Sequence, residues 1–375
     1  MRVLVAFGTR PEIIKLAPVY RALRRRMGIH TDTVWTGQQV ELAAGLLELF
    51  DIRLTVDAGL DVLRQPELTD KFGEIVRLIG DQLRRGRYDW LVVQGDTITA
   101  VAASIAGFLC KVPVAHVEAG LRTGDLQAPW PEEFNRRLVS VATTLHFAPT
   151  PRAEINLIRE GIAPANIHVV GNTVVDSLLD TRRRVAGDYQ PIDRAICDVP
   201  PGKLVLATTH RHENIGEPIA RVLRALRILG QDGDKVVVLP VHLDPEVRRM
   251  VEDILGAAPN VRLVAPLHYS DFVYLLSRAW CVVSDSGGIQ EEAPSFGLQV
   301  LITRETTERP EVLHSGFGRL VGSDTGAIVR GVRALTAAAA PQLLARPNPF
   351  GTGDAGERIA AVLAGEADQM LQAAE

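Results

Sequence analysis

The sequence predicts an α/β fold of two domains, each built around a doubly wound parallel sheet. Short apolar segments alternate with longer segments of helical spacing from one end of the chain to the other. Most of the apolar segments are continuous runs, as expected for strands that helices cover on both faces. A chain of 375 residues is also long enough for two such domains.

The predicted elements follow one another in a regular β-α order. Segments with helical spacing separate the strands. One example is residues 11–25, where Pro11 suits the first helical turn because no backbone donor is needed there. The predicted strands are residues 3–7, 31–36, 90–94, 112–116, 144–148 and 167–170 in the first half, and 204–208, 236–239, 261–264, 280–284 and 300–303 in the second.

A charged stretch and the PPG run at 200–202 mark the change of domain. We place the first domain at residues 1–172 and the second at 173–354. The remaining residues, 355–375, are expected to begin with a helix over about 355–373. Two such domains facing each other leave a cleft at the carboxyl ends of their strands, which is the usual ligand site of this architecture.

Composition and charge narrow the range of functions. The formal net charge of −4 gives no general electrostatic reason to bind nucleic acid or an anionic membrane. No apolar run approaches the ~18 residues of a membrane-spanning helix, and the apolar start of the chain is too short for a signal peptide. Cys110, Cys197 and Cys281 form no C-x-x-C pair, which indicates a reducing compartment. We therefore expect a cytoplasmic protein.

The sequence DSGGIQEE at 285–292 is the strongest local indication of a ligand. It follows a predicted strand and opens a helix. Gly287 and Gly288 let backbone N–H groups approach an anion, and Ser286 adds a hydroxyl. Glu292, one helical turn further on, suits the two hydroxyls of a ribose. One interpretation is a diphosphate cradle, and the other is a glycine-rich turn in which Ser286 only caps the helix.

Neither a nicotinamide cofactor nor a metal is expected. The sequence GTGDAG at 351–356 matches the dinucleotide fingerprint by its letters, but no strand precedes it and no β-α-β unit follows. His210 and His212 share one face of an extended segment, but the H-E-x-x-H spacing of a catalytic zinc site is missing.

Several carboxylates follow predicted strands, at the edge where a ligand would lie. Asp96 and Glu118 each come two residues after the end of a predicted strand, although Asp96 also suits a helix cap. Glu132 and Glu133 are neighbours on a helix, so only one of them can face a given site, and each has an arginine four residues on as an alternative partner. Carboxylates that converge on one edge repel one another, which suits general acid and base chemistry.

Four residues are candidate cations for a ligand. Arg10 and Lys15 follow the first strand, and His210 follows the first strand of the second half. Arg309 lies among acidic neighbours, so a surface ion pair is an alternative to a ligand contact.

Taken together, these motifs resemble the non-hydrolysing UDP-N-acetylglucosamine 2-epimerases. The motif set is highly specific, and the resemblance covers about residues 2–365. The motifs occur in the order of that family, as GTRPE (8–12), GDT (95–97), HVEAGLRTG (116–124), PWPEE (129–133), GNT (171–173), DSGGIQEEAPS (285–295) and TTERPE (306–311).

The resemblance implies a fold, an assembly and a reaction. The fold is that of the two-domain glycosyltransferase-B enzymes, with a C-terminal helix that crosses back to the first domain, and the assembly is a homodimer. The reaction is the interconversion of UDP-N-acetylglucosamine and UDP-N-acetylmannosamine, without a cofactor, for cell-surface polysaccharide synthesis. The implied catalytic residues are Asp96, Glu118, Glu132 and His210; the implied substrate contacts are Arg10, Lys15, Phe272 beside the uracil, Ser286, Gly287, Gly288, Glu292 and Arg309.

The chemistry explains this set of residues. C2 of the sugar is not adjacent to a carbonyl, so its deprotonation alone gives no stabilised carbanion. Elimination of UDP across C1 and C2, followed by re-addition from a glycal intermediate, avoids that difficulty. It needs at least two acid/base groups and fixed positive potential at the departing diphosphate.

Four other functions remain open. A related 2-epimerase of a modified UDP-sugar, such as a diacetamido uronate, would share most of the motifs. A hydrolysing relative would release UDP and free N-acetylmannosamine. A glycosyltransferase would need an acceptor pocket that the sequence does not identify. A UDP-sugar-binding protein without catalysis would not need the acid/base set.

A second UDP-sugar site is a further implication of the resemblance. In many bacterial members a regulatory UDP-N-acetylglucosamine binds beside the active site. Here Gln39 and Glu41 depart from the family pattern, and a carboxylate near a ligand diphosphate costs on the order of 1 kcal/mol. We expect this site to be weakened or absent, unless both side chains face solvent. The residues that would form it are Gln38, Arg64, Gln65, Arg211 and His242.

Overall fold

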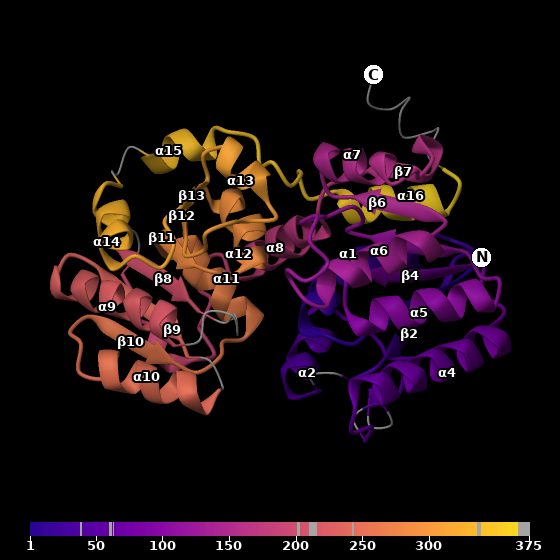
Figure 1. Cartoon of the computed structure of the whole chain (residues 1–375), viewed down its shortest axis with the longest axis horizontal. Coiled ribbons are helices and arrows are strands. Elements are labelled where there is room, and N and C mark those ends of the chain that lie inside the picture. The colour runs from indigo at the N-terminus through magenta and orange to yellow at the C-terminus, as the bar shows by residue number, and fades with distance from the viewer. Residues whose placement is uncertain are drawn as a thin grey trace. The chain divides into compact units, whose positions relative to one another are not determined.

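The computed structural model describes residues 1–37, 40–59, 62, 64–200, 203–209, 216–241, 244–335 and 339–366. The chain divides into two compact units (Figure 1). Unit 1 consists of Met1–Ser177 with Phe350–Glu375, and unit 2 of Leu178–Pro349. No helix among the described residues is long and apolar enough to cross a membrane.

Unit 1 contains a seven-stranded sheet in the order β3-β2-β1-β4-β5-β6-β7, and all of its strand pairs are parallel. β2 and β3 follow β1 on one side of it, whereas β4 pairs with β1 on the opposite side. The topological switch point therefore lies between β1 and β4. The strands are β1 (Arg2–Phe7), β2 (His30–Trp35), β3 (Val56–Asp57), β4 (Trp90–Gln94), β5 (Val114–Val117), β6 (Leu145–Ala148) and β7 (Ile167–Val169).

Helices cover both faces of this sheet (Figure 1). On one face α4, α5 and α6 pack side by side, and on the other α1 packs against α2 and α16. The helices of unit 1 are α1 (Arg10–Arg25), α2 (Val40–Leu49), α4 (Leu68–Gly86), α5 (Ile98–Leu109), α6 (Glu132–Ala142), α7 (Pro151–Arg159) and α16 (Ala355–Leu363), and α8 (Thr173–Arg184) continues into unit 2.

The apolar spacing of the sequence explains these helices. In α4, Ile75, Ile79 and Leu83 recur every four residues and are all buried, so one face of the helix packs against the sheet. Thr97 and Thr150 cap α5 and α7 by accepting the N–H of Ala100 and Ala153.

Unit 2 repeats the scheme with a six-stranded parallel sheet in the order β10-β9-β8-β11-β12-β13. Its switch point lies between β8 and β11. The strands are β8 (Leu204–Thr208), β9 (Val236–Pro240), β10 (Val261–Val264), β11 (Ala279–Ser284), β12 (Val300–Ile302) and β13 (Gly318–Leu320); the helices are α9 (Glu217–Gln231), α10 (Pro245–Leu255), α11 (Tyr269–Arg278), α12 (Gly287–Glu292), α13 (Pro310–His314), α14 (Thr325–Arg333) and α15 (Ala339–Leu344).

Each predicted strand corresponds to a strand of the structure, and the parallel doubly wound sheets are confirmed. The sequence missed β3 and β13, because both are short edge strands without a buried apolar run. The predicted helix over 355–373 is too long, because α16 ends at Leu363 and Gly365 takes a left-handed conformation with φ of +75°.

The final helix belongs to unit 1, where it packs against α1. A Cβ on Gly356 would lie 2.7 Å from the Cβ of Pro18, so only a glycine allows this close approach. Arg26 Nη1 lies 2.9 Å from Glu357 Oε2, and Asp176 Oδ1 accepts the Gly356 N–H at 2.8 Å. Burial raises the pKa of Asp176 to about 6.

Candidate active site

A buried ion pair lies at the carboxyl edge of the sheet of unit 1. Lys15, in α1, places its Nζ 2.6 Å from Oε1 and 2.7 Å from Oε2 of Glu118, the residue that follows β5. The amide of Gln94, at the end of β4, also donates to Glu118. The backbone of Glu118 is left-handed with φ of +65°, an uncommon conformation for a residue with a side chain. Three adjacent elements therefore hold this carboxylate in place.

Asp96 forms the second charged pair of this edge. Arg136 of α6 places its Nη2 2.7 Å and its Nε 2.8 Å from Asp96 Oδ2. The Asn135 amide donates to the backbone carbonyl of Asp96 at 2.8 Å. The alternative that Asp96 caps the following helix is wrong, because Thr97 is the cap. About a quarter of the Asp96 side chain (26%) stays exposed, so it remains open to a ligand.

The structure distinguishes Glu132 from Glu133. Glu133 is fully buried and accepts the N–H groups of Thr123 and Gly124 at 3.0 and 3.1 Å, so it holds that loop. Arg136 pairs with Glu133 at 3.3 Å. Glu132 is partly exposed, and its side chain makes no hydrogen bond or ion pair with any described residue. Of the two, Glu132 is therefore the one that remains available to a substrate.

Sequence reasoning gave no role to two buried titratable residues behind this edge. The Nε2 atom of His116, in β5, is 2.8 Å from the carbonyl oxygen of Gly95. His116 therefore supports the turn that carries Asp96. Burial lowers the pKa of His116 to about 3. Glu12, in the first turn of α1 next to Arg10, is also fully buried, and burial raises its pKa to about 7. An acid in the first motif of the chain was the only signal in the sequence.

In unit 2 the predicted cradle lies between β11 and α12. The N–H of Ser286 donates to Ser284 Oγ at 2.9 Å, and Ser284 Oγ is 2.7 Å from Thr208 Oγ1 across the switch point. Ser286 occupies the N-cap position of α12, but its hydroxyl makes no capping hydrogen bond. Of the residues that the structure describes, a Cβ on Gly288 would meet only Ser286 Oγ, at 3.8 Å, so these residues leave the backbone open at this point.

Arg309 lies directly over this turn. Its Nε donates to Glu291 Oε1 and its Nη1 to Glu308 Oε1, both at 2.6 Å. Only 7% of Arg309 is exposed, so the alternative of a surface ion pair is wrong. A Cβ on Gly287 would lie 2.6 Å from Arg309 Cζ, which explains a glycine at that position. The guanidinium therefore fixes the cradle, while its own charge is balanced by the two carboxylates.

The two residues implied for the nucleoside lie on adjoining helices. Glu292, in α12, is buried and accepts the hydroxyl of Tyr269 at 3.0 Å. Phe272 lies in α11, one turn after Tyr269, and is partly buried. Asp271, which directly precedes Phe272, is fully buried and accepts the hydroxyl of Tyr189 at 2.8 Å. Tyr269 and Asp271 are thus supporting residues that sequence reasoning missed.

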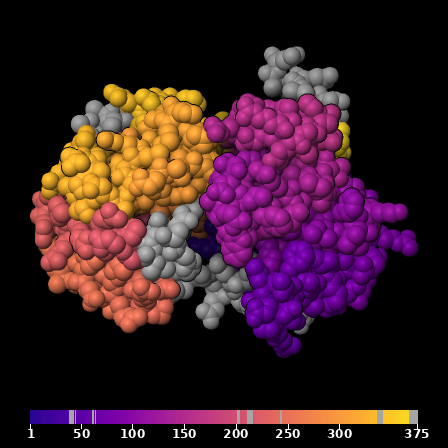
Figure 2. Space-filling view, in the orientation of Figure 1, coloured from indigo at the N-terminus to yellow at the C-terminus, as the bar shows by residue number. Residues whose placement is uncertain are grey.

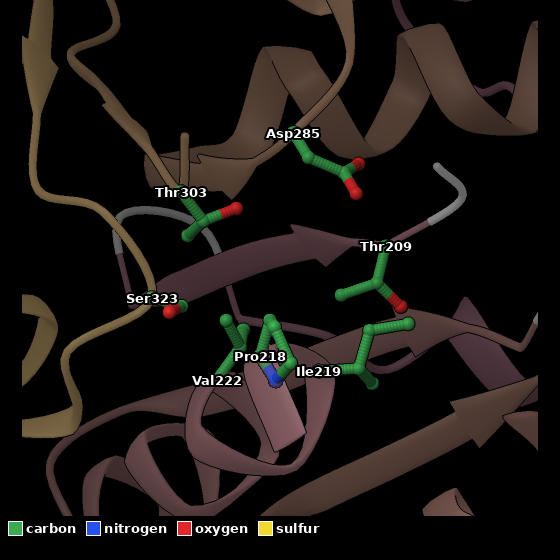
Figure 3. Close-up of a pocket in the computed structure, with 7 residues that line it drawn as sticks. All are labelled: Thr209, Pro218, Ile219, Val222, Asp285, Thr303 and Ser323. Carbon is green, nitrogen blue, oxygen red and sulfur yellow. The ribbon is translucent and has the colours of Figure 1, made fainter. Parts of the chain in front are cut away.

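A small pocket opens at the switch point of unit 2 (Figure 3). Asp285 directly precedes the cradle, and Thr209 directly follows β8. In Figure 3 the side chains of Asp285 and Thr303 point into the space between the elements. The lining residues are Thr209, Pro218, Ile219, Val222, Asp285, Thr303 and Ser323.

Other predicted site residues are placed only in part. His210 lies outside the described residues, as do Gln38, Arg211 and His242 of the second site. Arg64 is exposed and Gln65 partly buried, in the loop before α4. Within the described ranges, no group of three or more His, Cys, Asp and Glu could hold a metal ion.

Known proteins resemble the whole chain. A family model described as UDP-N-acetylglucosamine 2-epimerase matches residues 21–364. The UDP-N-acetylglucosamine 2-epimerase of Escherichia coli K12 is 42% identical over 373 residues, which cover 96% of this chain and 97% of the relative. The crystal structure of UDP-GlcNAc 2-epimerase from Neisseria meningitidis bound to UDP-GlcNAc superimposes with a TM-score of 0.89 at 38% identity, covering 97% of this chain and 100% of that one.

A more distant likeness concerns the fold alone. The glycotransferase of kitacinnamycin gives a TM-score of 0.66 at 15% identity, covering 98% of each chain. The glycosyltransferase-B-like fold expected from the sequence is thereby confirmed. The match over the full length, at about 40% identity, shows that this chain belongs to the UDP-N-acetylglucosamine 2-epimerase family and is an isomerase.

Proposed function

We propose that the protein interconverts UDP-N-acetylglucosamine and UDP-N-acetylmannosamine by elimination and re-addition of UDP. The observation that carries this proposal is the set of carboxylates at one edge of the sheet of unit 1. Lys15 fixes Glu118, Arg136 fixes Asp96, and Glu132 remains available. Carboxylates held at fixed positions can serve as the general base and general acid that this reaction needs.

The proposed reaction proceeds in two steps. In the first, a carboxylate takes the proton from C2, the C1–C2 double bond forms, and the C1–O bond to UDP breaks. In the second, UDP adds back to C1, and a protonated group on the opposite face returns a proton to C2. Asp96, Glu118 and Glu132 are the candidates for these proton transfers, with His210 as a further member of the set. Loss of one such group typically costs ~10²–10⁴-fold in rate.

Unit 2 is proposed to bind the UDP portion. The open backbone at Gly288 and the hydroxyl of Ser286 suit a diphosphate. Arg309, held by Glu291 and Glu308, keeps the turn in the shape that exposes its backbone N–H groups to the leaving group. Glu292, oriented by Tyr269, suits the ribose hydroxyls, and Phe272 suits contact with the uracil. The solved relative from Neisseria meningitidis is bound to UDP-GlcNAc, which supports this substrate.

Proton NMR in deuterated buffer tests the proposal. The purified protein is supplied with UDP-N-acetylglucosamine and no other addition, and we expect UDP-N-acetylmannosamine with deuterium at C2. Retention of the original proton at C2 would contradict the elimination. UDP with free N-acetylmannosamine would identify a hydrolysing enzyme. No conversion, together with activity on a diacetamido uronate sugar, would identify a 2-epimerase of a modified substrate.

A homodimer is part of the same proposal. The α5–α6 face of unit 1, which Figure 2 presents to the viewer, carries large apolar side chains in contact with water. Phe108 is 68% exposed and Val141 82% exposed, and α5 packs against α6. Such exposure on neighbouring helices is typical of an interface. We expect Val141→Glu to convert a dimer to monomers in analytical ultracentrifugation, and Ile192→Glu, an exposed apolar control in unit 2, to leave the dimer intact.

A further inference from the structure

Glu12 connects two turns that are far apart in the sequence. Its Oε2 accepts the backbone N–H of Gly8 at 3.0 Å and the hydroxyl of Thr9 at 2.8 Å. Its Oε1 accepts the hydroxyl of Thr97 at 2.6 Å, across 85 residues of chain. The Thr97 oxygen in turn accepts the N–H of Ala100 and so caps α5. One carboxyl group therefore joins the N-terminus of α1 to the N-terminus of α5.

This connection crosses the switch point of the sheet, where β1 lies beside β4. The β1–α1 turn leads into the helix with Arg10 and Lys15, and the β4–α5 turn carries Asp96. One member of each charged pair of the candidate site therefore lies on, or directly after, one of the two turns that Glu12 connects: Lys15 on α1 and Asp96 on the β4–α5 turn.

Capping of α1 alone does not account for the geometry. A glutamate in the first turn of a helix commonly reaches back to the residues before it, and Gly8 and Thr9 serve that purpose for Oε2. Such a cap needs one oxygen and normally stays near solvent. Here the side chain is fully buried, and the second oxygen is used for the other turn. Burial of an acid is costly unless hydrogen bonds satisfy it, and three donors do so here.

We infer that Glu12 is a positioning residue for the epimerisation, which holds the β1–α1 and β4–α5 turns together so that Lys15 and Asp96 keep their relative positions. This inference rests on the proposed function. A displacement of about 1 Å in an acid/base group can cost ~10²-fold in rate, so loss of the connection should act on turnover. The groups proposed to bind the UDP portion lie in unit 2, so we expect no change in UDP affinity.

The chain offers a matched set of variants. Thr97→Val removes both the donor to Glu12 and the cap of α5, whereas Thr97→Ser keeps the hydroxyl. Thr150→Val is the control, because Thr150 caps α7 of the same unit through the Ala153 N–H. Loss of that cap should lower the melting temperature as Thr97→Val does. Glu12→Ala removes the connection from the other side, and Glu12→Gln keeps its shape without the charge.

The experiment measures kcat, KM and UDP affinity for each variant that melts cooperatively, and follows the released products by NMR. We expect Thr97→Val and Glu12→Ala to lower kcat by ~10²-fold, with the dissociation constant of UDP unchanged within about two-fold. UDP and glycal should escape more often per turnover, because re-addition is slowed. Thr97→Ser and Glu12→Gln should recover most of the turnover. Thr150→Val should stay within about two-fold of the wild type.

Two outcomes would overturn the inference, and a third concerns the reaction itself. If Thr97→Val lowers kcat no more than Thr150→Val does, the effect is one of helix capping and Glu12 positions nothing. If Glu12→Ala weakens UDP binding while kcat is kept, Glu12 acts on the ligand. Should Glu12→Ala fail to fold, the comparison of Thr97→Val with Thr97→Ser decides alone. A wild-type protein that does not epimerise UDP-N-acetylglucosamine would refute the proposed function, and the role of Glu12 with it.

Discussion

Lys15 and Glu118 are 103 residues apart in the chain, yet the ammonium of one lies within 2.7 Å of both carboxylate oxygens of the other, and both side chains are buried. The parallel order β1-β4-β5 makes this possible, because it brings the start of α1 and the end of β5 to one edge. The pair is a structural element as well as a candidate for chemistry.

We expect removal of either partner to be strongly destabilising. Lys15→Met leaves a buried carboxylate without its cation, and Glu118→Gln leaves a buried ammonium, each at a cost of about 3–5 kcal/mol. The double variant should be more stable than the sum of the two losses implies. Urea denaturation at pH 7 measures this coupling. Losses that add without coupling would show that the pair contributes no net stability beyond its separate members.

We expect unit 1 to carry the proton-transfer groups and unit 2 to bind UDP. Glu118→Gln, Asp96→Asn and Glu132→Gln are expected to lower kcat by ~10²–10⁴-fold while UDP still binds. Ser286→Ala and Glu292→Ala should weaken UDP binding and change kcat less. Calorimetry with UDP and steady-state kinetics separate these effects. Loss of UDP affinity in the carboxylate variants, with normal affinity in the other two, would reverse the assignment.

The two glycines of the cradle should respond differently to alanine. Gly287→Ala pushes its Cβ into the guanidinium of Arg309, so we expect a loss of stability of about 1–3 kcal/mol. Among the described residues, the Cβ of Gly288→Ala meets only Ser286 Oγ, at an ordinary 3.8 Å, so the variant should keep its stability within about 0.5 kcal/mol. It should still weaken UDP binding, since a diphosphate would approach the backbone there. Normal UDP affinity in Gly288→Ala would place the diphosphate elsewhere.

Glu12 should make the stability of the protein depend on pH. Its pKa rises from 4.5 to about 7 on folding. Its contribution to stability is therefore complete below pH 4.5 and is lost as the pH rises through 7, because the charged form is then buried. Glu12→Gln has no charge to bury and lacks this loss. Its free energy of unfolding should therefore rise relative to that of the wild type by up to about 3 kcal/mol between pH 5 and pH 8. Urea midpoints across this range measure the difference, and a constant difference would contradict the assignment.

The second UDP-sugar site can be tested by kinetics. If Gln39 and Glu41 weaken it, the reverse reaction from pure UDP-N-acetylmannosamine should start without a lag and follow a hyperbolic rate curve. A reaction that stays silent until traces of UDP-N-acetylglucosamine are added would show that the site works. Glu41→Gln, which removes the charge, is the matched variant and should strengthen any dependence on the second ligand.

The sequence by itself determined the frame of the molecule. Continuous apolar runs identified both parallel sheets, because strands buried on two faces require such runs whatever their partners are. The parallel strands of a sheet end at a common edge, so Asp96 and Glu118 could be assigned to that edge of the first sheet, and Ser286 to that of the second, from their order alone. The order of the motifs along the chain can also be read without a structure, and it identified the family.

Only the tertiary structure decided how the site is assembled. Neighbouring residues such as Glu132 and Glu133 look alike in sequence, and the loop amides that bury one of them are brought there by folding. The sequence likewise did not reveal the partners of Arg309 or of the two carboxylate oxygens of Glu12, because those contacts depend on which elements pack together. Short edge strands such as β13 are defined by pairing with a neighbour. A local pattern describes what a residue can do, whereas contacts between distant segments decide which of these possibilities is realised.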